Sequence, residues 1–486
     1  MLRRSTTEVT RAVRGHPVLV AVLVAAALVR LAAAVTYAPA LMWTDSWQYV
    51  YATHLPGDFA PEKPNGYMLL LELFGTRLGL VTAVQHLLGL AGAVLMYAIL
   101  RRLGCRPLLA AAATGVVALD AYAIALEQYV LAEAAFTATL VCWAAVVVLL
   151  GPGPGPTALA GALLVAATTL RAVALFVIPV WVVYAVWRER GWLARALAIG
   201  VPVVALGLYG TWHDAATGGL GLTQMDGWML YGRTAEIGGC SGRTVPARDK
   251  PLCPPASGRL AGWNDDPYAY SLYSAESPMQ RAVGNLYSLP ADQRRVANAR
   301  LRAFARDVIH DRPFAFARIV ARDTAKYFVP GTMSRLKGFD EPITFPERSR
   351  GVPAVARSVQ RSYAPGYTAP PDGRARILPF YQRWVHTPRW LLAALVVASL
   401  VALATRVWPG GARRRQLAHL GEIALLTGAG LALVVGAALN HFEVRYLIPA
   451  VPLLVMGGTV AVSELVAASA PRRAPAAERE VPLAAA

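Results

Sequence analysis

The chain has 486 residues, of which 56% are hydrophobic and only 16% are charged, and its mean hydropathy is +0.43. Soluble globular proteins carry about 25% charged residues. The composition therefore excludes a cytosolic enzyme, a disordered protein and a small secreted domain held by disulfides. Apolar runs of about 20 residues, long enough to cross a bilayer, recur along the chain. We predict an all-α polytopic membrane protein.

The formal net charge is +18, from 47 Lys and Arg against 29 Asp and Glu. A soluble protein this basic would suggest nucleic-acid binding. Here much of the positive charge lies in short segments beside apolar runs, which is typical of cytoplasmic loops in membrane proteins. These segments contain Arg3, Arg4, Arg11, Arg14, Arg101, Arg102, Arg106, Arg188, Arg190, Arg195, Arg406, Arg413, Arg414, Arg415, Arg472 and Arg473.

The apolar runs predict about ten transmembrane helices with both termini in the cytoplasm. A single helix over 157–187 would be about 46 Å long, against a hydrocarbon core of about 30 Å. We therefore expect two short helices that turn near Arg171, which keeps the following arginines on the cytoplasmic side. The other predicted spans are 17–36, 79–100, 107–125, 130–150, 193–212, 389–408, 417–439 and 446–466.

The spans divide the chain into four parts. Residues 1–212 form a transmembrane module with a first outer loop at 37–66, and residues 213–388 form an extracytoplasmic α-rich domain. Residues 389–470 hold the last three helices, and residues 471–486 are a polar tail that we expect to be disordered in the cytoplasm. Apolar positions at helical spacing predict helices at 291–309 and 313–328.

Two of the four cysteines, Cys240 and Cys253, lie in the segment expected outside the cytoplasm. Thiols oxidise there, so we predict a Cys240–Cys253 disulfide. Two free thiols are the alternative. A metal site is less favoured because no His or second Cys pair has ligand spacing nearby.

The first outer loop carries an acidic residue among aromatic ones. Trp43, Trp47 and Tyr49 are typical of a membrane interface. Asp45 lies just beyond the outer end of the first helix, where a carboxylate can act as general base toward a hydroxyl. The alternative is a solvated aspartate or a helix cap.

Other polar residues recur at the outer ends of the predicted spans. Tyr67 follows a turn at Pro64-Asn65-Gly66. Glu127 and Glu133 flank the very short link between the third and fourth spans, and Arg171 lies at the turn of the short hairpin. The last outer turn runs through His441 to Glu443-Val444-Arg445-Tyr446-Leu447-Ile448-Pro449.

In this order the segments resemble the GT-C superfamily of integral-membrane glycosyltransferases, especially its protein-mannosyltransferase and aminoarabinose-transferase branch in bacteria. The resemblance covers 17–187 and returns at 440–450, where the branch often has Arg-Tyr followed by Leu and Pro. The branch often carries Asp-Glu in the first loop, whereas Ser46 follows Asp45 here. The second acidic function is therefore missing or comes from elsewhere, with Glu127 and Glu133 as candidates.

The resemblance implies a GT-C-like fold and a multi-pass enzyme of the bacterial plasma membrane. Such an enzyme moves a sugar, with inversion, from a polyprenyl-phosphate donor to a glycan, lipid or protein hydroxyl outside the cytoplasm. Asp45 would be the general base, and basic side chains would bind the donor phosphate. The phosphate-binding candidates are Arg445, Arg171 and Lys63, and the substrate-orienting candidates are Glu127, Glu133, Tyr67 and His441. The superfamily sometimes uses a divalent cation, for which the sequence shows no ligand cluster.

Each assignment has a plainer alternative. Arg445 is then a helix-end residue that reaches toward the interface, and Lys63 is solvated in a loop. Arg171 then pairs with Glu127 or Glu133 in a structural network, and the lone histidines His54 and His441 lie at the surface. For the whole chain the alternatives are a transporter or flippase of a lipid-linked glycan and a non-catalytic envelope-assembly protein.

Overall fold

The computed structural model describes residues 15–53, 62–75, 77–237, 240, 242, 245–254, 266–329, 344–347, 351–369, 377–407 and 418–469. In this part of the chain every element of regular secondary structure is a helix. One isolated β-bridge joins Leu41 to Tyr129. A segment inside lipid has no water to bond its backbone, and a helix satisfies its own amides and carbonyls. The predicted all-α class is confirmed.

Among the described residues, seven helical segments are long and apolar enough to cross a membrane. A bent pair, α6 (Pro107–Ala118) and α7 (Ala121–Gln128), forms an eighth candidate with a 48° bend. The structure therefore supports a polytopic membrane protein, and the full ten spans depend on two shorter helices. The seven are α2 (Pro17–Thr36), α5 (Leu78–Arg102), α8 with a π-helical end (Glu133–Leu150), α11 (Trp192–Thr217), α18 with α19 (Ile377–Thr405), α20 (Leu420–Asn440) and the segment ending in α21 (Val444–Ser469).

The two shorter helices form the expected hairpin. Helix α9 covers Pro154–Leu170, and a 3₁₀ turn (Ala172–Phe176) leads into α10 (Val177–Arg188). The Gly153 amide and the Thr157 hydroxyl donate to Glu189 Oε1 at 3.3 and 2.9 Å. The start of α9 therefore lies beside the end of α10, and the chain reverses at Arg171.

The bend between α6 and α7 is built around Asp120. Its Oδ1 accepts hydrogen bonds from the amides of Tyr122 and Ala123 at 2.9 and 3.0 Å, so it caps the N-terminus of α7. Its Oδ2 accepts from the Thr387 amide at 2.6 Å. Both carboxylate oxygens of Asp120 are therefore hydrogen-bonded at the bend. The bond to Thr387 also anchors the segment before α19 (Arg389–Val407).

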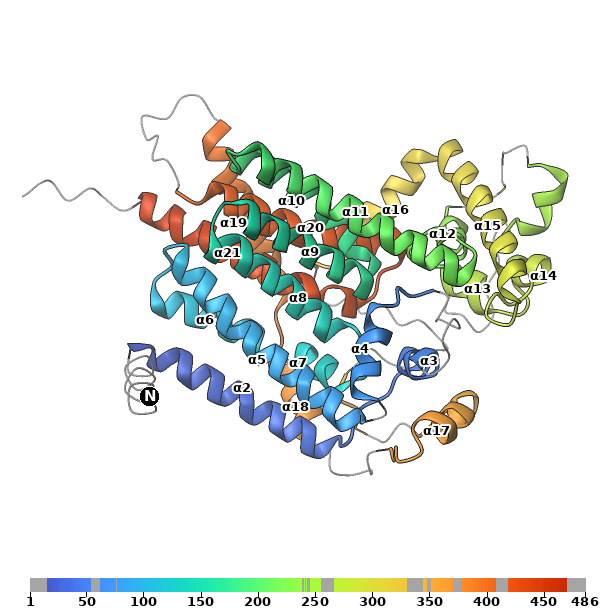
Figure 1. The fold of residues 1–486 in the computed structure, drawn as a ribbon, viewed down its shortest axis with the longest axis horizontal. Coiled ribbons are helices and arrows are strands. Elements are labelled where there is room, and N and C mark those ends of the chain that lie inside the picture. Colours follow the sequence, from blue (N-terminus) through green and yellow to red (C-terminus); the bar gives the residue numbers. More distant parts are fainter. Residues whose placement is uncertain are drawn as a thin grey trace, which may run out of the picture.

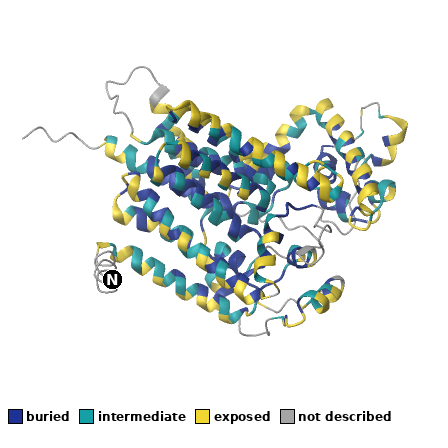
Figure 2. Cartoon of the chain, viewed as in Figure 1, coloured by how far each residue is buried: buried dark blue, intermediate teal, exposed yellow. Residues whose placement is uncertain are grey.

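The helices run roughly parallel to the long axis of the molecule, and its two ends differ (Figure 1). One end carries the basic links between α5 and α6 and between α10 and α11. The other end, here called the domain end, carries α12 to α16. Figure 2 shows the dark, buried residues concentrated in the middle of the bundle. Helices α2 and α11 expose large apolar side chains, which suits contact with lipid: Leu28, Leu31, Val35, Val203, Val204 and Leu208.

The domain at that end has its own core. It contains α12 (Asp226–Ala235), α13 (Pro267–Tyr273), α14 (Pro278–Val283), α15 (Ala291–Asp311) and α16 (Pro313–Lys326). The two helices predicted at 291–309 and 313–328 are confirmed as α15 and α16. Trp228, Leu301 and Phe304 belong to this core, whereas Phe345 and Tyr367 pack into the core of the membrane helices.

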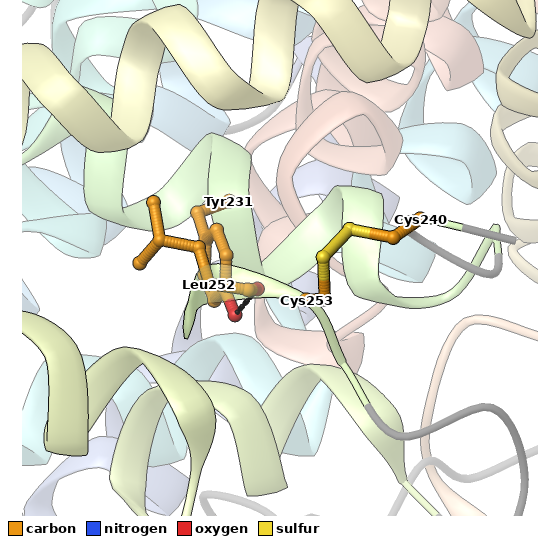
Figure 3. Close-up of a disulfide and its surroundings, with 4 residues drawn as sticks. All are labelled: Tyr231, Cys240, Leu252 and Cys253. Atoms are coloured by element: carbon orange, nitrogen blue, oxygen red, sulfur yellow. Dashed lines mark hydrogen bonds between the residues drawn. A yellow bond between two sulfur atoms is a disulfide. The ribbon is translucent and has the colours of Figure 1, made fainter. Parts of the chain in front are cut away.

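The predicted disulfide is present. Cys240 and Cys253 are bonded, with their Cα atoms 5.5 Å apart. The bridge ties the segment after α12 to the end of a 3₁₀ helix (Ala247–Leu252), and the Tyr231 hydroxyl donates to the Leu252 carbonyl beside it at 2.7 Å (Figure 3). His54 and the tail 471–486 lie outside the described residues.

Candidate functional site

Asp45 and Arg445 form an ion pair at the domain end. Within the first outer loop, residues Thr44–Thr53 form helix α3, which places Asp45 in the first helical turn. Arg445 belongs to the 3₁₀ turn Val444–Tyr446, and its Nη1 donates to Asp45 Oδ2 at 2.9 Å. Lys63 Nζ lies 3.4 Å from Asp45 Oδ1. The aspartate is therefore held between two cations.

Arg445 extends this pair into a larger network. Its Nε lies 2.7 Å from Glu443 Oε1 and 3.8 Å from Glu133 Oε1. Arg171 Nη1 lies 3.3 Å from the same Glu133 oxygen. At the other side Lys63 donates to Glu62 Oε1 at 2.8 Å. The charged cluster, as we name it, consists of Asp45, Glu62, Lys63, Glu133, Arg171, Glu443 and Arg445.

Tyrosine rings separate the cations of the cluster. The Tyr446 ring lies 5.0 Å from the Arg171 guanidinium and 5.1 Å from that of Arg445, within the range of cation–π attraction. Lys63 Nζ lies 5.0 Å from the Tyr49 ring, which packs edge-on against Tyr67. The Tyr67 hydroxyl donates to Gln85 at 2.8 Å, so this residue presents its ring toward the cluster.

Glu133 is the least satisfied member of the charged cluster. Its side chain is 1% exposed, and neither carboxylate oxygen has a hydrogen-bond partner among the described residues. Buried carboxylates in folded proteins normally accept several hydrogen bonds, because leaving one unbonded is costly. The two arginines attract Glu133 without bonding it. The carboxylate is therefore free to accept a hydrogen bond from a bound molecule.

The carboxyl groups of the cluster differ in proton affinity. Burial opposes ionisation of Asp45, but Lys63, Arg445 and Arg171 outweigh it and hold the pKa of this carboxyl well below its ordinary value. Burial raises the pKa of Glu443, and Arg445 offsets only part of that effect. Environments that drive the pKa values of two carboxyl groups apart in this way are typical of acid–base sites. Asp45 is ionised at neutral pH, and Glu443 holds a proton more readily than usual.

An apolar cavity of about 60 Å³ adjoins the cluster at Glu133. It lies between α5, α7, α8 and the start of α21, and it has room for about four water molecules. Its walls are mostly apolar and include Met96, Val141 and Ile448, and Arg30, Asp120 and Glu127 also line it. Glu133 lines both the cavity and the charged cluster, so a polar and an apolar environment meet at this residue.

Glu127 does not join the charged cluster. Arg30 binds it with two hydrogen bonds of 2.7 Å, from Nε to Oε2 and from Nη2 to Oε1. His86 Nδ1 lies 2.8 Å from Oε2, and His86 Nε2 lies 2.8 Å from Gln128 Oε1. All of these side chains are buried. Helix packing turns Glu127 toward α2, where it neutralises a membrane-buried arginine instead of pairing with the charged cluster.

His441 lies beside the cluster and contacts the domain. Its ring stacks on Tyr268 with the centroids 4.5 Å apart. Burial, followed by the nearby Arg233, lowers the pKa of His441 to about 3, so the imidazole is neutral. His441 is partly buried and stacks on Tyr268, so it is not the free surface histidine of the alternative.

The domain is bound to the turn that carries Glu443 and Arg445. Arg233 is fully buried, lies 2.7 Å from Asp323 and donates to the Ala438 carbonyl at 2.9 Å. The Tyr327 hydroxyl lies 3.3 Å from both the amide and the carbonyl of Glu443. These contacts set the position of the turn, so the domain helps to orient the site.

Five predicted residues meet in the charged cluster: Asp45, Lys63, Glu133, Arg171 and Arg445. Sequence reasoning assigned no role to Glu62, Glu443 or Tyr446, although Glu443 and Tyr446 belong to the quoted last outer turn and Glu62 directly precedes Lys63. It also missed Arg30, whose signal was a lone charge inside the first apolar run. The described residues contain no group of three or more His, Cys, Asp or Glu that could hold a metal ion.

The fold and the cluster define a polytopic helical membrane protein with a buried ion-pair network at one end of its bundle. No family model, curated protein or solved structure matches the chain.

Proposed function

We propose that the protein is a membrane glycosyltransferase that moves a sugar from a polyprenyl-phosphate donor to the hydroxyl of an envelope glycan, lipid or protein. The observation that supports this most strongly is the position of Glu133, between the charged cluster and an apolar cavity. A lipid-linked sugar has the same division, with a polar head and an apolar chain. The cavity, at about 60 Å³, would receive only the part of the chain nearest the phosphate.

In the proposed reaction Asp45 accepts the proton of the acceptor hydroxyl as its oxygen attacks the anomeric carbon. The bond from that carbon to the phosphate oxygen breaks, and polyprenyl phosphate leaves with the electron pair. The sugar configuration inverts because attack and departure occur on opposite faces. Arg445 and Arg171 would hold the phosphate through charge-assisted hydrogen bonds, and Glu133 would accept one from a sugar hydroxyl.

Donor binding would also activate the base. Without a donor, Arg445 binds Asp45 and contributes to its low pKa. A phosphate on Arg445 competes with this contact and adds negative charge beside Asp45. Both effects raise the pKa of the carboxylate and make it a better proton acceptor. The base would thus gain strength only when a donor is in place.

The two ends of the bundle support a location for this site. The links at the end opposite the domain are rich in arginine, including Arg101, Arg102, Arg188 and Arg190. Basic short loops favour the cytoplasmic side. We therefore propose that the domain end, with its disulfide, lies outside the cytoplasm of a bacterial cell.

The test compares Asp45→Asn with Asp214→Asn in purified full-length protein reconstituted in vesicles. Asp214 is an exposed residue near the end of α11 and serves as the matched control. Radiolabelled polyprenyl-phosphate mannose and polyprenyl-phosphate arabinofuranose would be supplied with envelope acceptor extracts. Loss of a general base typically lowers the rate by about 10² to 10⁴. Near-normal transfer by Asp45→Asn with either donor would contradict the role of Asp45.

A lipid-linked glycan flippase is the second candidate, because the described part of the bundle contains an interrupted helix. It bends by 48° at Asp120, and broken helices in the membrane are a feature of transporters. A flippase would move fluorescent polyprenyl-phosphate sugar across vesicle bilayers without releasing polyprenyl phosphate. Sugar transfer without such movement would favour the enzyme.

A further inference from the structure

A second cavity, of about 250 Å³, lies away from the charged cluster, between the end of α11 and the face of α15. The segment that links α11 to α12 closes one side of it. The residues that line it are Thr217, Gly218, Gly219, Leu220, Thr223, Gln224, Arg295, Asn298, Ala299 and Arg302. Two of these residues are arginines and none is acidic, so the lining itself carries positive charge.

The two arginines are held in place by polar contacts at the cavity wall. Arg295 Nη1 donates to the Gly218 carbonyl at 2.6 Å, which fixes its guanidinium there. Arg302 donates to Asp226 through Nη2. A guanidinium presents five donors in a planar fork that matches the oxygens of a phosphate.

The side chain of Asn298, which lies next to the arginines, forms hydrogen bonds within the cavity wall. Asn298 accepts from the Trp228 amide at 3.0 Å and donates to Asp226 at 2.8 Å. It therefore shapes the cavity and positions Asp226 behind Arg302. Thr217 and Thr223 also line the cavity, and the Thr217 hydroxyl donates to the His213 carbonyl at 2.7 Å. The lining thus offers chiefly its two guanidinium groups to one oxygen-rich anion.

The cavity also lies at the level where a bilayer ends. Helix α11 is long and apolar enough to span a membrane and exposes Val204 and Leu208 to its surroundings. Trp212 is partly exposed near its end, and Leu220, at the cavity itself, is 74% exposed. Tryptophan is enriched at the boundary between hydrocarbon and head groups. The phosphates of one leaflet would therefore lie beside Arg295 and Arg302.

We propose that this cavity binds the phosphodiester of a glycerol-based anion, with Arg295 and Arg302 as its phosphate ligands. The same chemistry occurs in the head group of phosphatidylglycerol and in free glycerophosphodiesters. This site is separate from the proposed transfer reaction and does not depend on it.

The test measures binding to the purified full-length protein in a neutral detergent by native mass spectrometry. Three probes are compared: short-chain phosphatidylglycerol, short-chain phosphatidylcholine and glycerophosphoglycerol. The variants are Arg295→Gln/Arg302→Gln, which removes the charge, and Ala299→Trp, which fills the cavity and keeps the charge. Arg306→Gln, an exposed arginine on the same helix outside the lining, is the control.

We expect phosphatidylglycerol to bind, with an affinity at least about tenfold lower in the double variant, since each lost hydrogen bond to a charged group weakens binding by about tenfold or more. Ala299→Trp should weaken binding to a similar degree, and Arg306→Gln should leave it unchanged. Comparable binding of glycerophosphoglycerol would identify a free ligand, and its absence would identify a lipid. Equal binding by wild type, the double variant and Ala299→Trp would overturn the proposal. Thermal unfolding of each variant shows whether it is folded, and Ala299→Trp keeps the test valid if the double variant is not.

Discussion

Asp45 and Arg445 are 400 positions apart in the chain, and their side chains meet with 2.9 Å between Oδ2 and Nη1. Both are mostly buried, and Lys63, Glu443 and Glu133 surround the pair. A buried ion pair contributes little net stability, because desolvation offsets the attraction. The charged cluster brings seven ionisable groups together, and its Glu133 carboxylate has no hydrogen-bond partner among the described residues. This arrangement is therefore better explained by ligand binding and catalysis than by a contribution to folding stability.

Arg445→Gln should weaken donor use chiefly through KM. The donor phosphate is anionic in both ground and transition states, so its arginine contributes similar binding energy to each. Loss of one charged hydrogen-bonding partner corresponds to about 1.5 to 3 kcal/mol, or roughly a 10- to 150-fold rise in KM. Steady-state kinetics with polyprenyl-phosphate sugar would measure this. Arg318→Gln, an exposed residue of the domain, is the matched control. A drop in kcat at constant KM would contradict phosphate binding by Arg445.

Arg30 and Glu127 should behave as a structural pair. Removing one partner of a buried ion pair leaves an uncompensated charge and costs about 3 to 5 kcal/mol. Arg30→Met and Glu127→Met should each lower the melting temperature strongly in detergent. The double variant Arg30→Met/Glu127→Met should recover much of the loss, because no lone charge remains. If the double variant loses the sum of the two single effects, the pair is not coupled.

Two glycines of α5 provide a matched test of how Glu127 is accommodated. A Cβ at Gly89 would overlap the Glu127 carboxylate and contact Arg30, whereas a Cβ at Gly92 has nothing within 4 Å. Gly89→Ala should therefore destabilise the protein by about 1 to 3 kcal/mol. Gly92→Ala should leave stability unchanged or raise it by up to about 1 kcal/mol. Melting temperatures of both variants would show the difference, and equal values would place Glu127 elsewhere.

Glu443 should give the protein a pH-dependent stability term. Its folded pKa is raised above the ordinary 4.5, so the folded state binds this proton more tightly than the unfolded state. The favourable contribution is complete below the unfolded pKa and is lost as the pH rises through the folded pKa. The glutamine in Glu443→Gln cannot titrate. The melting temperature of this variant should therefore rise relative to that of wild type as the pH increases above 4.5.

The measurement is the difference in melting temperature between wild type and Glu443→Gln across about pH 4 to 8. Glu276→Gln, an exposed residue between α13 and α14, serves as the control and should show a constant difference. Asp45 acts with the opposite sign, since its lowered pKa removes stability only in strong acid. A melting temperature of Glu443→Gln that falls relative to wild type as the pH rises would contradict the environment assigned to Glu443.

The membrane helices could be predicted from hydropathy. The charge of the short loops then indicates which helix ends lie on the same side of the membrane, so the meeting of distant residues there was also predictable. Asp45, Arg171 and Arg445 each follow or precede an apolar run at the same end of the bundle. This places them at one level of the bundle, where Arg445 pairs with Asp45 and both Arg445 and Arg171 lie beside Glu133. The hairpin at Arg171 followed from length alone, since one helix would exceed the bilayer.

The rotation of each helix could not be predicted in this way. Helices α7 and α8 are apolar on nearly every side, so no polar stripe shows which face Glu127 or Glu133 turns to its neighbours. Packing directs the first toward Arg30 and the second toward Arg171. Helix α3 was missed because its mixed aromatic and polar residues show no period of 3.6.

The spread of the charged cluster along the chain has a consequence for biosynthesis. Asp45, Glu62, Lys63, Glu133 and Arg171 are all translated long before Glu443 and Arg445. At about 5 to 20 residues per second, roughly 20 to 80 seconds separate the synthesis of Asp45 and Arg445. During that interval an incomplete bundle holds Asp45 with Lys63 beside it but without Arg445, the arginine that donates a hydrogen bond to it. Nascent chains truncated before residue 440 should therefore be recognised by membrane quality-control proteases, and chains that include Arg445 should escape them.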